Sequence, residues 1–311
     1  MACLSEFMRE WADGSPFILA KTSGSTGEPK TIRLLKTDMM SSAEATNRFF
    51  KINSASVLAI PLSMDYIAGK MMAVRSIAAN CRLVEMPVSN NIDIDNYITL
   101  LSVVPTQLDS LLSNKNLKEK VDHILIGGAP LSHHQEEIIS SLGISAWLGY
   151  GMTETCSHVA LRKVGGNGIF QAMDGIAFKT DERDCLVIES DRFSWRKLTT
   201  NDVVELISST EFRWVGRADN TINSGGLKLH PEQLEEYYRK LIVDMPTFFL
   251  TGQPDAKLGQ AMVMVAENPP ENLLAIIRER IEDHRFVPKR IVAVDRIPRT
   301  ANGKILRKIS D

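Results

Sequence analysis

The chain has 311 residues, with 36 Lys and Arg against 38 Asp and Glu and a formal net charge of -2. Hydrophobic residues make up 44% and charged residues 24%, values typical of a globular protein that exclude a disordered or fibrous chain. The balanced charge gives no reason to expect attraction to nucleic acid or to a membrane surface. The length suits one large domain and one smaller one.

The cysteines and the N-terminal residues bear on the compartment. Four cysteines are scattered without a CxxC pair, so the sequence predicts neither a disulfide framework nor a zinc site. Residues 1–14 carry three acidic side chains and lack the apolar core of a signal peptide, and no later apolar run is long enough to span a bilayer. We therefore expect a cytoplasmic protein without membrane insertion, whose oligomeric state the sequence does not predict.

Short apolar runs alternate with helical patterns in the first half of the chain. Strands are predicted at residues 56–61, 81–86 and 123–126, and helices at Ile67 to Ala79 and Pro105 to Leu112. Such βα alternation predicts a mostly parallel sheet covered by helices. From Phe170 the pattern changes to short strands and turns, which indicates a small antiparallel β region.

The last ninety or so residues show a third pattern, and this length is enough for a small domain. Pro231 to Leu241 opens with a proline and continues with glutamates, a typical helix start. Further elements are predicted as strands at 247–251, 261–266 and 290–294 and as a helix at 271–284. The sequence thus predicts an α/β protein with a large N-terminal domain, residues 1–218, and a small α+β C-terminal domain, residues 219–311.

Residues 22–30, TSGSTGEPK, combine small hydroxylated residues, glycines and a lysine. Glycine permits close backbone approach, so this segment could hold polyphosphate oxygens with N–H groups, hydroxyls and an ammonium. Its spacing differs from that of the GxxxxGK[ST] loop. A flexible linker has a similar composition and remains the alternative.

Residues 150–155, YGMTET, follow an apolar stretch. The tyrosine ring could stack on a base, a threonine hydroxyl could contact a phosphate, and the carboxylate of Glu154 could hold Mg²⁺. A helix cap of the Thr/Glu type is the alternative. Two weaker signals are small-residue turns at residues 126–131 and 200–202.

Two longer signals lie near the C-terminus. Residues 216–232 read GRADNTINSGGLKLHPE, and residues 298–307 read PRTANGKILR. A basic C-terminal cluster by itself is most often a solvated tail, which is the alternative for the second segment.

These segments, in this order, resemble the adenylate-forming superfamily of acyl-CoA synthetases, luciferases and peptide-synthetase adenylation domains. The family patterns TSGSTGxPK, YGxTE and PxTxxGKxxR match residues 22–30, 150–154 and 298–307, and GRxDxxIxxxGxxxxPxE matches from Gly216 through Pro231, with Gln233 in place of its last glutamate. The resemblance implies ATP, Mg²⁺ and CoA as the cofactor and co-substrates, together with a small-molecule acid.

The resemblance also implies a role for each matching residue. The β- and γ-phosphates would be held by the phosphate loop, the adenine would be framed by two glycine-containing turns, the ribose would be bound by an acid–base pair, and Mg²⁺ would be bound by Glu154. The phosphate-loop residues are Thr22, Ser23, Gly24, Ser25, Thr26, Gly27 and Lys30. The adenine-framing residues are Gly128, Ala129, Tyr150 and Gly151, and the ribose-binding pair is Asp202 and Arg217. Thr153 would contact the α-phosphate, and Lys304 would lie between the acid carboxylate and that phosphate, where a cation stabilises the growing charge.

In this superfamily the C-terminal domain rotates between the two half-reactions. The resemblance implies that Asp219 is the hinge, and that rotation exchanges Lys304 for the Gly225–Gly226 segment, whose glycines would pass close to the pantetheine arm of CoA.

The chain departs from the superfamily in two places. Most relatives have a long segment before the phosphate loop, so we expect an N-terminal subdomain to be missing or reduced. The usual histidine of the PLxHxxG segment is Met64 here.

The substrate is inferred from the local sequence of three segments. Residues 102–108, 124–131 and 149–155 look most like those of the o-succinylbenzoate–CoA ligases of menaquinone biosynthesis. An aromatic dicarboxylate needs a polar or cationic group for its second carboxylate. The candidates are Ser157, His158, Thr106 and Gln107, of which His158 and Thr106 are assigned to the acid pocket. For His158, a partly exposed helix position is the alternative. Activation of another acyl acid, loading of a carrier protein, and a non-catalytic nucleotide-binding role also remain open.

Overall fold

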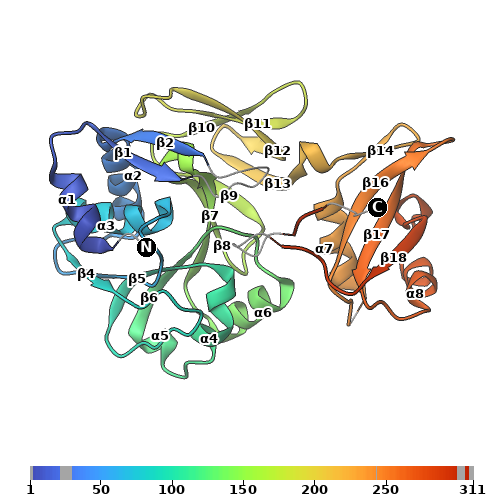
Figure 1. The fold of residues 1–311 in the computed structure, drawn as a ribbon, viewed down its shortest axis with the longest axis horizontal. Helices are drawn as coiled ribbons and strands as arrows, with labels where there is room; N and C mark the ends of the chain where they lie inside the picture. The colour runs from blue at the N-terminus through green and yellow to red at the C-terminus, as the bar shows by residue number, and fades with distance from the viewer. Residues whose placement is uncertain (1–2, 22–29, 243, 300–304, 308–311) are drawn as a thin grey trace. The chain divides into compact units, whose positions relative to one another are not determined.

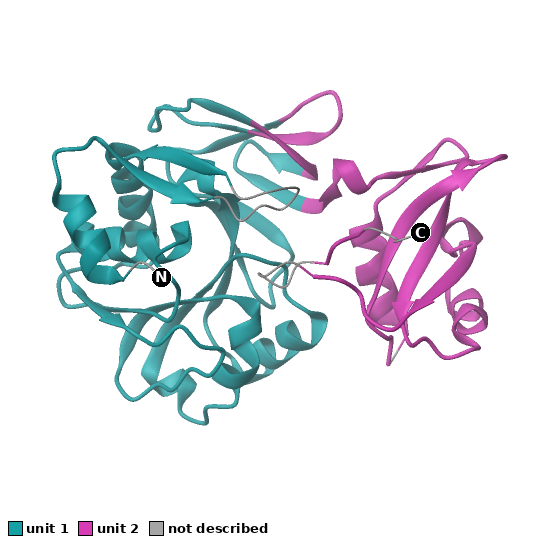
Figure 2. Ribbon diagram, viewed as in Figure 1, with its two compact units in different colours: residues 1–179, 188–198, 206–213 teal, residues 180–187, 199–205, 214–311 magenta. Residues whose placement is uncertain are grey.

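The computed structural model describes residues 3–21, 30–242, 244–299 and 305–307. The chain forms two compact units (Figure 2). Unit 1 contains residues 1–179, 188–198 and 206–213, and unit 2 contains residues 180–187, 199–205 and 214–311. The expected division into a static and a moving domain at residue 218 stays a prediction.

Five parallel strands form the centre of unit 1, in the order β4-β3-β5-β6-β7. Their bounds are β3 Val57–Ile60, β4 Arg82–Glu85, β5 Ile98–Val103, β6 Val121–Ile126 and β7 Ala146–Met152. Strands covered on both faces bury consecutive residues rather than alternate ones, as β5 does from Leu100 to Val103 and β6 from Ile124 to Ile126.

Helices connect these strands and cover both faces. They are α3 Ile67–Ala79, α4 Leu108–Leu112, α5 Leu117–Lys120 and α6 His133–Leu142, and α2 Lys36–Phe49 packs on α3. The connection from β3 to β4 runs one way along the sheet, and those from β5 through β6 to β7 run the other way. Right-handed crossovers therefore place α3 on one face and α4 to α6 on the other, as Figure 1 shows.

The order reverses between β3 and β5, and ligands of open α/β sheets bind beside such a reversal, at the carboxyl ends of the strands. Beyond β7 the sheet continues antiparallel in the order β8-β9-β13-β12-β11-β10. The bounds of these strands are β8 Ser157–Lys163, β9 Ile169–Ala172, β10 Ala177–Thr180, β11 Cys185–Glu189, β12 Lys197–Ser208 and β13 Glu211–Arg217. This is the predicted antiparallel region.

At the start of the chain, helix α1 Leu4–Ala12 precedes a two-stranded antiparallel sheet of β1 Phe17–Lys21 and β2 Thr31–Leu35. Lys70 of α3 pairs with Glu10 of α1 at 3.3 Å, which ties the first helix to the parallel part of unit 1. The sequence did not predict α1, this hairpin or α2.

Unit 2 contains a second, five-stranded sheet with two helices. Its elements are β14 Ile222–Ser224, β15 Leu227–Leu229, α7 Pro231–Leu241, β16 Phe248–Asp255, β17 Gly259–Glu267, α8 Leu273–Arg280 and β18 Arg290–Val294. Its core includes Tyr238 of α7, Phe248 and Met264 of the sheet and Ile277 of α8, all fully buried. Short 3-10 turns lie at η1 Pro105–Gln107, η2 Thr153–Thr155, η3 Ala218–Asn220 and η4 His284–Phe286.

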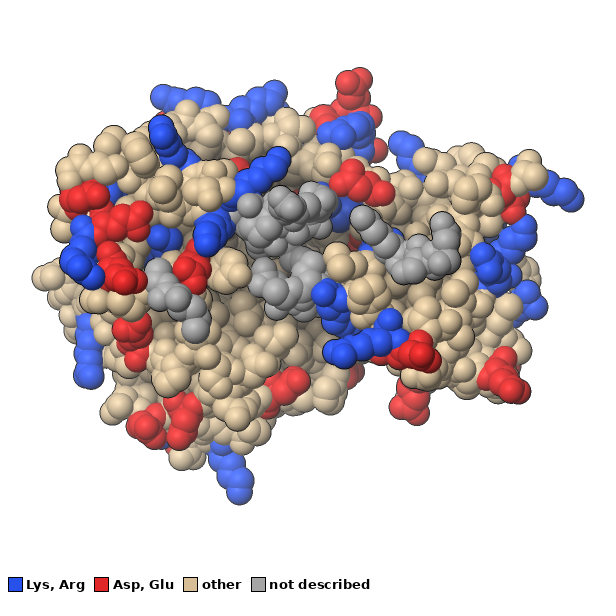
Figure 3. All heavy atoms as spheres, in the orientation of Figure 1, with Lys and Arg blue, Asp and Glu red and all other residues tan. Residues whose placement is uncertain are grey.

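The predicted α/β fold with a small C-terminal α+β unit is confirmed, and three predicted elements, α3, α7 and β18, have the predicted bounds. The helix predicted over residues 271–284 is shorter, because α8 ends at Arg280 and a 3-10 turn follows. Within the described part of the chain, no helix is both long and apolar enough to cross a membrane. Figure 3 shows basic and acidic side chains interspersed on the visible face of each unit.

Candidate functional site

The predicted adenine-binding segments follow two neighbouring parallel strands of unit 1. Gly128 and Ala129 come directly after β6, while Tyr150 and Gly151 lie near the end of β7. Ile126 of β6 pairs with Leu148 of β7, so both segments lie at the same carboxyl edge of the sheet. The backbone of Gly128 has a φ of +90°, which L side chains rarely adopt, and it is exposed. The fold therefore brings together two turns suited to close approach by a ligand.

The ring of Tyr150 is held by two phenylalanines. It packs edge-on against Phe170 and Phe212, with ring centroids 5.7 and 5.1 Å apart, and these two rings stack on each other at 5.3 Å. Tyr150 is half-buried, so its orientation is fixed while part of it remains accessible. This arrangement suits stacking against a planar base.

Gly151 occupies a position that no other residue fits. The register of β7 against β8 shifts between Tyr150 and Gly151, and a Cβ on Gly151 would lie 2.1 Å from the carbonyl oxygen of Ser157. The two backbones therefore pass each other at a separation that only glycine permits.

The turn after β7 carries Thr153 and Glu154. Thr153 is buried and Glu154 is exposed, so the carboxylate of Glu154 is accessible to a solvated Mg²⁺. The Oγ1 of Thr155 accepts from the Met152 N–H at 2.9 Å and lies 2.7 Å from the Ser157 carbonyl oxygen. The capping interaction considered as an alternative thus exists, but it is made by Thr155 and leaves Thr153 and Glu154 outside it.

Two residues in the left-handed region follow this turn. Cys156 has a φ of 59° and Ser157 a φ of 124°, and neither is a glycine. Such conformations store strain and concentrate at functional sites, since packing must enforce them. Together they carry the chain from the Thr153–Thr155 turn into β8.

His158, a candidate for the acid pocket, lies on β8 opposite Gly151. The alternative that it occupies a partly exposed helix position is wrong, because it is a buried strand residue, 7% exposed. Its Nε2 lies 3.1 Å from the hydroxyl of Thr46, which also lies 3.0 Å from the carbonyl of Ser42. If the single hydroxyl proton goes to Ser42, Nε2 is the protonated ring nitrogen and Nδ1 is an acceptor.

Arg75 is the cation that the sequence analysis missed. It lies on α3, is 1% exposed, and its Nη2 is 3.1 Å from the Ser157 hydroxyl and 3.5 Å from Nδ1 of His158. Burial lowers the pKa of Arg75 to about 9, and burial together with this cation holds the pKa of His158 well below its usual range. His158 is therefore neutral at physiological pH and accepts from a charged guanidinium.

The described residues give Arg75 no carboxylate partner, and its Nε is buried without a hydrogen bond. A buried charge without a counterion is costly, so it is usually retained where an anion binds. A single arginine in the otherwise mostly apolar run of α3 was the sequence signal that could have revealed it.

Thr106, the second candidate for the acid pocket, lies on η1 at the carboxyl end of β5 and is exposed. Its neighbour Gln107 is buried and bonds to the backbone of Val104, Pro61 and Ser89. Gln107 thus fixes the segments after β3, β4 and β5, while its neighbour Thr106 presents its side chain to solvent.

The predicted ribose pair lies in unit 2. Oδ1 of Asp202 accepts from the Trp214 indole and from Nη1 of Arg217, each at 3.3 Å, and Arg217 also pairs with Asp219 at 3.2 Å. The Asp202 and Asp219 carboxylates raise the pKa of Arg217 despite its half-burial. An acidic and a basic group that hold each other in place can together donate to and accept from a pair of hydroxyls.

The predicted hinge, Asp219, has a second partner. The amide of Asn201 lies 3.3 and 3.2 Å from its two carboxylate oxygens. Asp219 lies in the 3-10 turn Ala218–Asn220, so a residue from β12 and one from β13 hold the side chain at this turn.

Gly225 and Gly226 form the two-residue turn between β14 and β15, with φ values of +57° and +84°. Positive φ at both central positions defines a tight hairpin that strongly favours glycine. The predicted CoA-side segment is therefore a narrow, side-chain-free tip.

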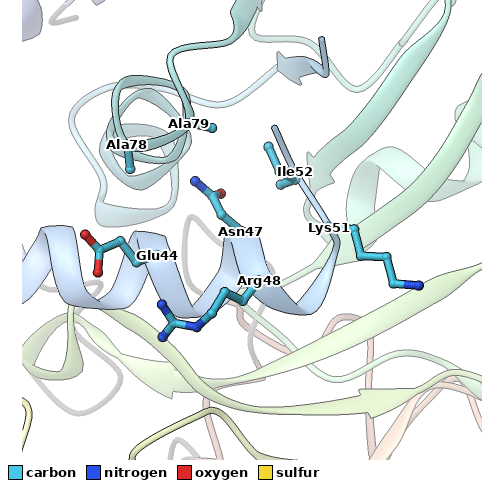
Figure 4. A pocket seen from close by; sticks show the side chains of 7 residues that line it. All are labelled: Glu44, Asn47, Arg48, Lys51, Ile52, Ala78 and Ala79. Carbon is cyan, nitrogen blue, oxygen red and sulfur yellow. The ribbon is translucent and has the colours of Figure 1, made fainter. Parts of the chain in front are cut away.

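Several predicted residues lie outside the described residues: Thr22, Ser23, Gly24, Ser25, Thr26, Gly27 and Lys304. Lys30 is described; it is exposed and directly precedes β2. Two surface hollows, of about 310 and 290 Å³, contain none of the predicted site residues. The first, between α2 and α3, is lined by Glu44, Asn47, Arg48, Lys51, Ile52, Ala78 and Ala79 (Figure 4).

Two family models match the chain. The AMP-binding enzyme model matches residues 8–176, and the AMP-binding enzyme C-terminal domain model matches residues 249–304. The chain is 28% identical over 332 residues to a probable 2-succinylbenzoate–CoA ligase of Mycobacterium tuberculosis, covering 96% of this chain and 84% of that protein.

Two solved structures are similar throughout. An acyl-CoA synthetase (AMP-forming)/AMP-acid ligase II-like protein from Dyadobacter fermentans is 34% identical with a TM-score of 0.65, covering 97% of this chain and 91% of that chain. The o-succinylbenzoate coenzyme A synthetase of Bacillus subtilis, solved with ATP and magnesium ion, is 22% identical with a TM-score of 0.76, covering 93% and 68%. The sequence, the fold and these matches together show that the chain belongs to the AMP-binding enzyme family.

Proposed function

We propose that this chain activates a carboxylic acid with ATP, releasing pyrophosphate to form an acyl adenylate, and then transfers the acyl group to the thiol of CoA with release of AMP. We further propose that the acid is o-succinylbenzoate. Curated relatives from several bacteria carry the name 2-succinylbenzoate–CoA ligase, which supports this substrate.

The described residues fit the nucleotide. Gly128 would allow its adenine to approach the backbone, Gly151 lets β7 pass close to β8 beside it, and Tyr150 would offer a fixed ring. Asp202 and Arg217 would bind the ribose hydroxyls, and the exposed carboxylate of Glu154 would hold Mg²⁺, which neutralises phosphate charge when bound. The phosphate-loop residues and Lys30 would bind the β- and γ-phosphates.

The remaining proposed roles follow the order of the reaction. Lys304 would stabilise charge between the acid carboxylate and the α-phosphate, with Thr153 on the same phosphate. Rotation about Asp219 would then bring Gly225 and Gly226 to the thioester step.

The observation that best supports o-succinylbenzoate is the buried cation Arg75 beside Ser157 and His158. Ser157 is half-buried and lies two residues beyond the Thr153–Thr155 turn, so the guanidinium lies beneath a surface next to the proposed phosphate contact. A dicarboxylic acid has one carboxylate to activate and one to bind, and the second would be bound through the Ser157 hydroxyl, which accepts from the Arg75 guanidinium and can donate to an anion. A monocarboxylic acid would leave Arg75 without an anion.

An AMP-release assay over a panel of acids, with and without CoA, tests this proposal. We expect o-succinylbenzoate to be activated with kcat/KM roughly 100-fold or more above that for benzoate, because a site built for a polar group rejects analogues that lack it. Equal or faster turnover of benzoate or of a medium-chain fatty acid would refute the substrate assignment. Thioester formation on a carrier protein but not on CoA would refute the acceptor assignment.

A further inference from the structure

Arg307, three residues after Lys304, is fixed inside unit 2. Its Nη2 donates to Oε2 of Glu235 at 2.9 Å, and its Nη1 bonds both to Oε1 of Glu235 and, at 3.1 Å, to the carbonyl oxygen of Leu250. The guanidinium also lies over the ring of Phe249, 5.9 Å from its centroid. Arg307 thus makes a two-pronged contact with a carboxylate that is itself 4% exposed.

This pair completes one edge of the small sheet. β16 is the terminal strand, hydrogen-bonded to β17. The Leu250 N–H donates to Oε1 of Glu235 at 2.7 Å while the Leu250 carbonyl accepts from Arg307. The two charged side chains therefore satisfy both backbone groups that a further strand would otherwise occupy.

This contact directly follows a backbone segment whose described residues are paired. Arg299 and Ile305 form an antiparallel bridge, and the Leu306 N–H donates to the Pro298 carbonyl at 2.9 Å. Residues 298–299 and 305–306 are therefore held side by side, directly before Arg307. Lys304 is covalently linked to Ile305, so whatever fixes Ile305 limits the reach of the lysine.

A second glutamate links Arg307 to the predicted hinge turn. Glu232 lies one helical turn before Glu235 on α7, and its Oε1 is 3.7 Å from Nε of Arg307. The same oxygen accepts from the amide of Asn220 at 2.5 Å, and Asn220 directly follows Asp219. The first turn of α7 thus holds both Arg307 and the turn at Asp219.

Stability alone does not explain this arrangement. Replacing a buried ion pair by apolar side chains is often neutral or stabilising, whereas charged pairs with several directed bonds specify one geometry. Resting on the proposed function, we propose that Arg307 is a positioning residue for acyl-adenylate formation. Through Glu232 and Glu235 it fixes the backbone at Ile305 and Leu306, and thereby limits the positions that the covalently linked Lys304 can reach.

The experiment compares the two half-reactions in the full chain with Arg307→Met, Arg307→Lys and Glu235→Gln. Pyrophosphate release without CoA reports adenylation, and AMP release from supplied acyl adenylate with CoA reports thioester formation. We expect Arg307→Met to slow adenylation roughly 10- to 100-fold, because a small misplacement of a catalytic group has effects of that size. The KM for ATP and the thioester step should change less than about threefold, and Arg307→Lys should recover part of the rate.

Glu235→Gln is nearly isosteric and keeps an acceptor for Leu250, so it tests the pair even if Arg307→Met folds poorly. Arg285→Met is the matched control, since it removes an exposed arginine–carboxylate pair from the same unit. Equal slowing of both half-reactions, or unchanged adenylation in Arg307→Met and Glu235→Gln, would overturn the positioning role.

Hydrogen exchange of the peptide covering residues 298–307 provides a readout that is independent of activity. Faster exchange in Arg307→Met than in wild type and in Arg285→Met supports the restraint, and unchanged exchange contradicts it. If wild type activates no acid but the exchange difference is present, the proposed function has failed while the structural restraint stands.

Discussion

Nη2 of Arg75 lies 3.1 Å from Oγ of Ser157, although the two residues are 82 positions apart in the chain. The contact connects α3 to the start of β8, directly after the turn that carries Thr153 and Glu154. It places a buried positive charge next to the segment that is proposed to contact the nucleotide. This relationship is the basis of the first two predictions.

Replacement of Arg75 by methionine should separate stability from activity. Removal of a buried charge without a carboxylate partner should raise the free energy of unfolding by about 1–4 kcal/mol. Turnover of o-succinylbenzoate should fall roughly 100-fold, while the slow turnover of benzoate should stay unchanged. Urea unfolding and the AMP-release assay measure the two effects.

Arg48→Met is the control for Arg75→Met. Arg48 lies on the neighbouring helix α2 and forms an exposed ion pair with Asp174. Arg48→Met should leave the turnover of both acids and the free energy of unfolding nearly unchanged. Equal losses with both acids in Arg75→Met would show that the arginine does not recognise the second carboxylate.

His158 should make the stability of the protein depend on pH. Its pKa in the folded state lies well below the unfolded value of 6.5, so below pH 6.5 the unfolded chain binds a proton that the folded chain does not. Stability contributed by the neutral imidazole is therefore fully present above pH 6.5 and is lost as the pH falls, by up to about 1.4 kcal/mol per pH unit.

The variant His158→Gln should lower the dependence of the free energy of unfolding on pH between pH 6.5 and 5.5, because it removes the group whose proton uptake differs between the folded and unfolded states. Glutamine can still bond to Thr46, so the folded structure should be kept. Urea unfolding at pH 7.5, 6.5 and 5.5 gives the slope. His133→Gln, at an exposed position, is the control. An unchanged slope in His158→Gln would mean that the histidine is protonated in the folded protein.

Gly151→Ala should disrupt the carboxyl end of β7. The added methyl group would lie 2.1 Å from a backbone oxygen, which cannot move as a flexible side chain can. We expect a loss of roughly 1–3 kcal/mol of stability together with loss of nucleotide binding. Gly14→Ala is the matched control, because nothing lies within 4 Å of its added Cβ. Comparable unfolding midpoints for the two variants would contradict the close-packing argument.

Asp219 permits a test of the proposed rotation. Asp219→Ala removes the contacts with Asn201 and Arg217 but keeps backbone freedom, whereas Asp219→Pro also fixes φ. We expect proline to slow one half-reaction far more than the other, and alanine to affect both modestly. A hinge role is excluded if proline slows the two half-reactions equally or leaves both unchanged.

Lys304→Ala should affect rate more than binding. Loss of a charge that acts in the transition state should lower the rate of acyl-adenylate formation roughly 100-fold or more, with little change in the Kd for ATP. Single-turnover pyrophosphate release and equilibrium titration with ATP measure the two quantities. Adenylation at a rate near that of wild type would remove Lys304 from the mechanism.

The sequence alone determined the class of chemistry and much of the fold. Motifs with fixed spacing led to the AMP-binding enzyme family, because each is a continuous segment that can be recognised from the sequence alone. Helices α3 and α7 and strand β18 were predicted with their observed bounds, since apolar periodicity and a helix-starting proline are local signals.

Only the tertiary structure decided which distant side chains meet. In the sequence, Arg75 is one residue of a predicted helix, and His158 is a candidate for the acid pocket that could also lie partly exposed. Packing of α3 against β8 buries both side chains and brings them into contact. Asp219 and Arg307 belong to motifs, but no motif predicts that Asp219 contacts Asn201 or that Arg307 contacts Glu235. Burial and the pKa values that follow from it depend on atoms brought together by long-range packing, and residue spacing along the chain carries no information about those atoms.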